Sequence, residues 1–158
     1  MKIHFLTTGK TADKHLMLAA EEYKSRIEHY LPFEMRLIPE LKNTKHLTAA
    51  EQKEKEAELF LKQIEAADEL FLLDEKGKEY SSAEFAQFIG LKLRSSAKRI
   101  VFAAGGAYGF SEKIYRRSNG LVSLSKMTFP HQMARLIFLE QLYRAMTILK
   151  GEPYHHEG

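Results

Sequence analysis

Residues 121–156 read LVSLSKMTFPHQMARLIFLEQLYRAMTILKGEPYHH. The segment begins with a short apolar strand, Leu121–Leu124, which a polar turn follows at Ser125–Thr128. From Phe129-Pro130-His131 we expect a helix to about Leu149. Its apolar residues point in nearly every direction: Met133, Leu136, Ile137, Phe138, Leu139, Leu142, Tyr143, Met146, Ile148 and Leu149.

A helix that is apolar all round is buried on several sides. One domain of 158 residues has too little core to surround such a helix, so we expect a subunit interface to cover part of it. Gly151 ends the helix, and the tail after it carries the phenol of Tyr154 and the imidazoles of His155 and His156.

Length and composition indicate one globular domain over residues 1–158. No apolar run reaches the ~20 residues of a membrane span, and the start MKIHFLTTGK lacks a signal-peptide cleavage site. We therefore expect a cytoplasmic protein without a membrane partner. The absence of cysteine excludes disulfides, thiolate catalysis and cysteine-zinc sites. His155-His156 has no acidic or histidine cluster to complete a metal site, so no metal is expected.

The net charge of +3 is compatible with a nucleic-acid partner without selecting one. Basic residues are concentrated between Lys92 and Arg117, where seven Lys or Arg residues accompany one acid, Glu112. This stretch is a candidate contact for phosphates. A solvated helix face explains the same pattern equally well.

Apolar strand patterns alternate with helical patterns along the whole chain. The expected helices begin after Asp13, at Thr48 (with capping-box spacing to Glu51, and running to about Ala67), at Ser81 or Ser82, and at Ser111. The expected strands are Lys2–Thr7, Met35–Ile38, Leu70–Leu73 (followed by a loop at 75–78), Arg99–Ala104 and Leu121–Leu124. This alternation predicts a single α/β domain with a mostly parallel sheet.

In such sheets ligands bind at the carboxyl ends of the strands. Three of these ends are distinctive: Leu73-Asp74, Gly105-Gly106 and Leu124–Phe129. Paired glycines let the backbone approach a ligand closely, although a tight strand-to-helix turn also requires them. A dinucleotide fingerprint fits poorly, because the spacing to Gly109 differs and the glycines follow a late strand.

The motifs together resemble a known family, the SPOUT-class methyltransferase H of large-subunit ribosomal RNA, a pseudouridine N3-methyltransferase (YbeA-like). The resemblance covers the whole chain. It rests on Leu72-Leu73-Asp74 with Gly77, Gly105-Gly106-x-x-Gly109, SLSKMTFPH at 123–131, EQLYRA at 140–145 and Gly151-x-Pro-Tyr-His155.

The resemblance implies a parallel-sheet SPOUT fold with a C-terminal trefoil knot, a homodimer, and methyl transfer from S-adenosylmethionine to N3 of a pseudouridine in 23S ribosomal RNA. It implies assembled ribosomes as the substrate, with Lys10 as a further candidate RNA contact. The cofactor-binding residues that it implies are Leu73, Gly105, Leu124, Ser125, Lys126, Met127, Thr128 and Phe129.

The sequence leaves the general base open. His155 is the first candidate, because a tail can reach a partner's site; Tyr154 and His131 also lie in or near the family motifs. Tyr154 and His155 have a second interpretation, in which they order the tail or stack on the target base. Arg144 either orients the substrate or pairs with Glu140 four residues earlier.

Two alternative functions remain. One is a SPOUT-class methyltransferase that acts on another RNA, such as transfer RNA. The other is a catalytically silent ribosome-associated binding protein that keeps the fold, against which the intact Gly105, Gly106 and Leu124–Phe129 segments argue.

Overall fold

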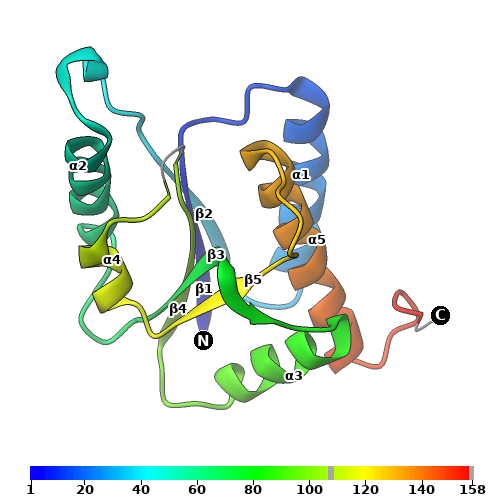
Figure 1. The fold of residues 1–158 in the computed structure, drawn as a ribbon. Coiled ribbons are helices and arrows are strands. Elements are labelled where there is room, and N and C mark those ends of the chain that lie inside the picture. Colours follow the sequence, from blue (N-terminus) through cyan, green and yellow to red (C-terminus); the bar gives the residue numbers. More distant parts are fainter. Residues whose placement is uncertain (107–108, 157–158) are drawn as a thin grey trace.

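The computed structural model describes residues 1–106 and 109–156 (Figure 1). Within this part of the chain, strands and helices alternate as the sequence pattern predicts. The elements in chain order are β1 (Lys2–Thr8), α1 (Lys14–Glu28), β2 (Phe33–Ile38), the 3₁₀ helix η1 (Thr44–His46), α2 (Ala49–Leu61), β3 (Glu69–Glu79), α3 (Ser82–Leu93), β4 (Arg99–Ala104), α4 (Glu112–Arg117), β5 (Gly120–Ser123) and α5 (His131–Leu149).

The described strands form one sheet in the order β2-β1-β4-β3-β5, and each neighbouring pair in it is parallel. This confirms the predicted α/β class with a parallel sheet. Because β4, β3 and β5 are neighbours, their carboxyl ends lie side by side. The three distinctive strand ends of the sequence therefore meet at one edge of the sheet.

Helices cover both faces of the sheet, with α1, α3 and α5 on one face and α2 and α4 on the other (Figure 1). Side chains of a strand alternate between the faces. Ile3 and Phe5 accordingly join the core under α1, α3 and α5, whereas Leu6 packs in the core under α2 and α4.

Helix α5 buries one side against the sheet. The ring centroid of Phe138 lies 4.5 Å from that of Phe5 and 4.9 Å from that of Phe102. Met133 and Leu149, by contrast, stay 36% and 38% exposed. The chain itself therefore covers only part of the apolar surface of this helix, and cover by a second subunit stays a prediction.

Strand β3 differs from its sequence-based prediction. A strand over Leu70–Leu73 and a loop at 75–78 were expected, but β3 continues to Glu79 with a break in register. Leu73 pairs with Val122 of β5 before the break, and Lys78 pairs with the same residue after it. Gly77 leaves no room for a side chain, since a Cβ atom there would lie 2.6 Å from the backbone carbon of Leu121. Residues 74–77 therefore leave the ladder and return to β5.

The helices begin at the predicted capping residues, but the capping box forms at α3 and not at α2. The Asp13 carboxylate accepts the backbone N–H groups of His15 and Leu16, which confirms it as an N-cap. Thr48 accepts the N–H of Glu51, but the reciprocal capping box is formed by Ser81 and Glu84.

Helix α2 ends at Leu61 and not near Ala67, because the chain must turn there to enter β3. Asp68 fixes this turn by accepting the N–H of Glu65 at 2.7 Å. No helix in the described part of the chain has the length and apolar character needed to cross a bilayer.

Candidate active site

A cavity of about 510 Å³ opens at the carboxyl ends of β4 and β5, beside the break in β3 that follows Leu73. This volume lies within the ~300–1,000 Å³ typical of small-molecule sites. Its walls combine apolar side chains, an open glycine backbone and several charged groups. They are Lys53, Leu73, Asp74, Glu75, Lys76, Ala104, Gly105, Gly106, Gly109, Phe110, Tyr115, Leu124, Ser125, Met127, Thr128, Phe129, His131 and Ala134.

The glycines after β4 are required by the chain's own packing as well as by space for a ligand. A Cβ atom on Gly105 would lie 3.3 Å from both the carbonyl carbon of Gly109 and the ring of Phe110. A Cβ atom on Gly106 would lie 2.8 Å from a carboxylate oxygen of Glu56, a buried residue of α2. The backbone consequently forms a side-chain-free wall of the cavity.

The segment after β5 is held by short-range hydrogen bonds. The Ser123 hydroxyl donates to the carbonyl of Ser125 at 3.1 Å, and the Ser125 hydroxyl accepts the N–H of Met127 at 2.9 Å. This turn brings Leu124, Ser125 and Met127–Phe129 to the cavity. Lys126 is the exception among the predicted cofactor residues, because its ammonium group points to Glu79 at 3.7 Å and its side chain is 86% exposed.

A hydrogen-bonded pair stands at the β3 side of the cavity. The Tyr115 hydroxyl, from α4, donates to Oδ2 of Asp74. Oδ1 of Asp74 accepts the backbone N–H of Lys76 at 2.8 Å. Burial and the neighbouring carboxylate raise the pKa of Tyr115 well above its ordinary value, so this phenol stays protonated and acts as a donor.

The predicted catalytic residues Arg144, Tyr154 and His155 gather around Glu140 on α5. Arg144 Nε donates to Glu140 Oε1 at 3.0 Å, and Tyr154 donates to the same oxygen at 3.0 Å. Arg144 Nη1 lies 3.0 Å from Nδ1 of His155. Burial and hydrogen bonds to Tyr23 and Glu140 raise the pKa of Tyr154.

This tail cluster is distant from the cavity of its own chain. His131 lines the cavity, and Arg144 lies thirteen residues further along the same helix, a separation of about 20 Å at 1.5 Å per residue. The tail is also tied to the turn after α1, since the Tyr30 hydroxyl donates to Glu152 at 2.7 Å. Burial and this hydrogen bond raise the pKa of Tyr30 to about 12. The cavity and the tail cluster are therefore two separate places on one chain.

Comparison with known proteins identifies the family. A model described as "Predicted SPOUT methyltransferase" matches residues 1–155. Proteins named "Ribosomal RNA large subunit methyltransferase H" from Parabacteroides distasonis and Phocaeicola vulgatus are each 55% identical to this chain over 157 residues, covering 99% of it and 100% of those proteins. The protein of that name from Flavobacterium johnsoniae is 50% identical with the same coverage.

The chain belongs to the SPOUT methyltransferases, in the methyltransferase H family.

Most residues that the family resemblance assigns to the cofactor lie in one cavity of this SPOUT methyltransferase. Seven of the eight line it, all except Lys126. The sequence did not single out Lys53 or Tyr115 as residues that line the cavity. Tyr115 lies 41 residues from Asp74 in sequence, and no local motif connects the two residues.

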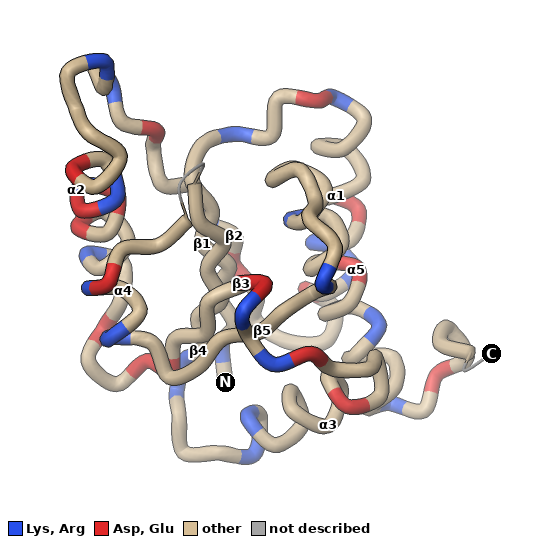
Figure 2. Tube along the Cα trace, viewed as in Figure 1, with Lys and Arg blue, Asp and Glu red and all other residues tan. Residues whose placement is uncertain are grey.

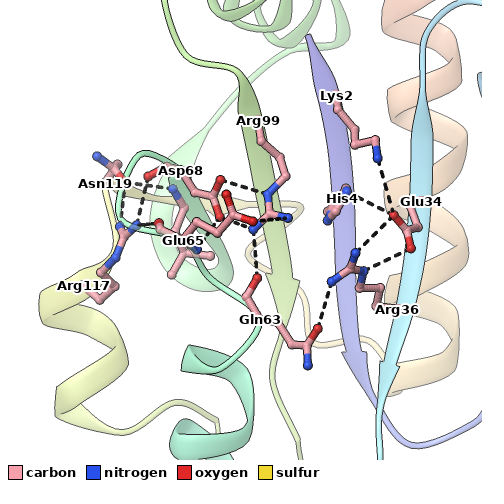
Figure 3. Close-up of polar contacts among 11 residues, drawn as sticks. Lys2, His4, Glu34, Arg36, Gln63, Glu65, Asp68, Arg99, Arg117 and Asn119 are labelled. Atoms are coloured by element: carbon pink, nitrogen blue, oxygen red, sulfur yellow. Dashed lines mark hydrogen bonds and ion pairs between the residues drawn. The ribbon is translucent and has the colours of Figure 1, made fainter.

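The basic stretch from Lys92 to Arg117 proves to be largely engaged within this SPOUT methyltransferase. Arg99 pairs with the buried carboxylate of Asp68, and Arg117 donates to the backbone carbonyls of Glu65 and Asp68 (Figure 3). Lys92 and Arg116 likewise have carboxylate partners, Glu69 at 2.7 Å and Glu112 at 3.5 Å. Arg99 and Lys92 also lie toward the amino ends of the strands, away from the cavity.

Proposed function

We propose that this chain transfers a methyl group from S-adenosylmethionine to N3 of a pseudouridine in large-subunit (23S) ribosomal RNA, acting on assembled ribosomes in the cytoplasm. The observation that carries the proposal is the glycine-walled cavity at three neighbouring strand ends, in a chain half or more identical over its length to proteins named for ribosomal RNA methylation.

The residues around the cavity fit S-adenosylmethionine. Leu73, Leu124 and Phe129 offer an apolar surface to a base, and the open backbone at Gly105-Gly106 offers hydrogen-bonding groups. Asp74, Lys53 and Lys76 supply both signs of charge for a ligand that carries an ammonium group and a carboxylate. When bound, the cofactor supplies a methyl group activated by its sulfonium.

The cavity of one subunit is completed, in this proposal, by the tail of a second. The tail cluster lies about 20 Å along α5 from the cavity of its own chain, too far to meet a substrate there. The large apolar side chains Met17, Leu18 and Met133 are exposed on neighbouring parts of α1 and α5. A homodimer that covers them buries apolar surface and brings each tail to the partner's cavity.

The tail residues then handle the target nucleotide. Arg144 has donors and no acceptors, so in its present contact Nδ1 of His155 is the acceptor, and a neutral ring carries its proton on Nε2. We propose that His155 exchanges Arg144 for the nucleobase, takes the N3 proton on Nδ1, and leaves Arg144 to orient the nucleotide beside Tyr154. Orientation contributes up to ~7–11 kcal/mol in ideal cases, and a base adds roughly 10²–10⁴-fold.

We also infer the trefoil knot implied by the family resemblance. Its support is the double pairing of β5 with β3 on both sides of the excursion at residues 74–77, with Gly77 against the backbone of Leu121. In this arrangement the chain that forms β5 and the 124–129 segment passes through an earlier loop of the chain.

Cations near the cavity are the proposed RNA contacts, in place of the basic stretch at 92–117. The loops after β1 and β2, which lie at the carboxyl edge of the sheet, carry Lys residues (Figure 2). Lys10, Lys14, Lys42 and Lys45 are exposed there, and within the described residues none of them has a carboxylate within 4.0 Å. Unpaired ammonium groups remain available to replace counterions on phosphates.

The test is transfer of labelled methyl from S-adenosylmethionine to assembled ribosomes, isolated large subunits and bulk transfer RNA. The ribosomes must carry the pseudouridine and lack the methyl group. The proposal predicts label at one pseudouridine of the large-subunit RNA in assembled ribosomes. Label on transfer RNA instead would move the function to another RNA, and neither label nor cofactor binding would leave the silent binding protein.

A further inference from the structure

We propose that Asp74, held in place by Tyr115, is a cofactor-binding residue that accepts hydrogen bonds from the ribose diol or the ammonium group of the bound cofactor. Both residues line the cavity, and they come from different elements, β3 and α4. The inference rests on the proposed function, in that the ligand is taken to be S-adenosylmethionine. It adds a recognition role for two side chains that the family motifs did not assign.

The carboxylate of Asp74 is oriented by contacts on both of its oxygens. Oδ1 accepts the N–H of Lys76 at 2.8 Å, and Oδ2 accepts the Tyr115 hydroxyl. An ionised carboxylate has about four lone-pair positions, so about two remain for a ligand. Because both present partners are donors from the chain itself, the side chain is fixed before the ligand arrives, and little conformational entropy is lost on binding.

Tyr115 is itself held in a defined position. Its ring packs edge-on against Phe110, which also lines the cavity, with centroids 5.9 Å apart. This packing fixes the orientation of the ring, so the hydroxyl group points at Asp74. Tyr115 acts through Asp74 and is a positioning residue.

The Asp74 carboxylate favours ligands that carry hydrogen-bond donors. A carboxylate accepts from a ribose diol or from an ammonium group, and S-adenosylmethionine has both. Either contact is a hydrogen bond to an ionised group, which contributes more than one between neutral groups.

The experiment measures ligand affinity by calorimetry, without any turnover. The ligands are S-adenosylhomocysteine, which has both the ribose diol and the ammonium group, and methylthioadenosine, which keeps the diol and lacks the ammonium. The variants are Asp74→Asn and Tyr115→Phe. Glu112→Gln is the matched control, since it removes an exposed acid from the same short helix, outside the cavity.

We expect Asp74→Asn to weaken S-adenosylhomocysteine binding about tenfold or more, Tyr115→Phe to weaken it less, and the control to stay within about twofold of wild type. An equal loss for methylthioadenosine assigns the contact to the ribose, whereas unchanged methylthioadenosine binding assigns it to the ammonium group; either result supports the proposal.

If Asp74→Asn binds both ligands with wild-type affinity, the proposal for Asp74 is overturned. Should Asp74→Asn fail to fold in a thermal melt, Tyr115→Phe decides: a loss of affinity supports the proposal, and unchanged affinity overturns it. A wild-type chain that binds neither ligand would instead contradict the proposed function, so the two failures are distinguishable.

Discussion

At the scale of single residues, His4 is a buried base among charged neighbours. Its side chain is 1% exposed, and Nε2 lies 3.2 Å from Glu34 Oε2 without the alignment of a hydrogen bond (Figure 3). Burial first, and then the charges of Arg99, Arg36 and Lys2, lower its pKa below the ordinary 6.5, while Glu34 opposes them. The folded chain therefore holds His4 neutral.

This burial predicts a loss of stability in mild acid. The unfolded chain takes up the His4 proton near pH 6.5 and the folded chain only at lower pH. The contribution of His4 is thus complete above pH 6.5 and falls as the pH drops through that value, by at most about 1.4 kcal/mol per unit. Urea unfolding at pH 7.5 and 5.5 should show a larger fall for wild type than for His4→Leu. Equal falls would contradict the burial of a neutral ring.

A second residue-scale prediction concerns Gly105. Substitution by Leu places Cβ 3.3 Å from Gly109 and Phe110, and the longer side chain must displace that turn or enter the cavity. We expect S-adenosylhomocysteine binding to be lost in calorimetry while circular dichroism stays native. Ser96→Leu, at an exposed position before the opposite end of β4, is the control. Normal affinity in Gly105→Leu would remove the cofactor from this cavity.

At the scale of elements, the sequence predicts most helices and strands, because apolar periodicity and capping residues are local signals. Asp13, which was predicted as the N-cap of α1, is an example. The parallel sheet follows from the alternation of these locally predicted elements, but the order of its strands was not predicted. The continuation of β3 to Glu79 was missed, because it depends on pairing with β5, more than 40 residues later. The Asp74–Tyr115 pair was also missed, because its two residues are far apart in the sequence. The distance between the tail cluster and the cavity became clear only from the full length of α5.

Helix α5 is expected to contribute to the dimer interface. If α1 and α5 form the dimer interface, Met133→Glu places a charge in an apolar contact and should convert dimers to monomers in light scattering after size exclusion. Leu91→Glu is the matched control, because Leu91 is 62% exposed on α3. Monomer formation by the control and not by Met133→Glu would move the interface to another face.

At the scale of the whole molecule, some cations are engaged within the fold and others are not. Arg99 and Arg36 have carboxylate partners in the described residues, whereas Lys42 and Lys45 beyond the carboxyl ends of the strands have none (Figures 2 and 3). Paired cations are engaged within the fold, whereas unpaired ones remain available for a polyanion.

Reversing the unpaired charges should weaken the RNA contact selectively. The double change Lys42→Glu and Lys45→Glu is expected to raise KM for ribosomes about tenfold or more and to reduce its salt dependence, with S-adenosylhomocysteine affinity unchanged. Arg94→Glu with Lys98→Glu, exposed changes between α3 and β4, should have little effect on KM. The opposite ranking would restore the stretch at 92–117 as the contact.

In the proposed homodimer, the cavity of one subunit works with the tail of the other. Methyl transfer to ribosomes from a mixed dimer of Gly105→Leu and His155→Ala subunits tests this cooperation. Each homodimer should be nearly inactive, the first without cofactor and the second without its base. The mixed dimer unites an intact cavity with an intact partner tail, so it should recover about half of the wild-type rate, one site of two. A mixed dimer as inactive as its parents would contradict the claim.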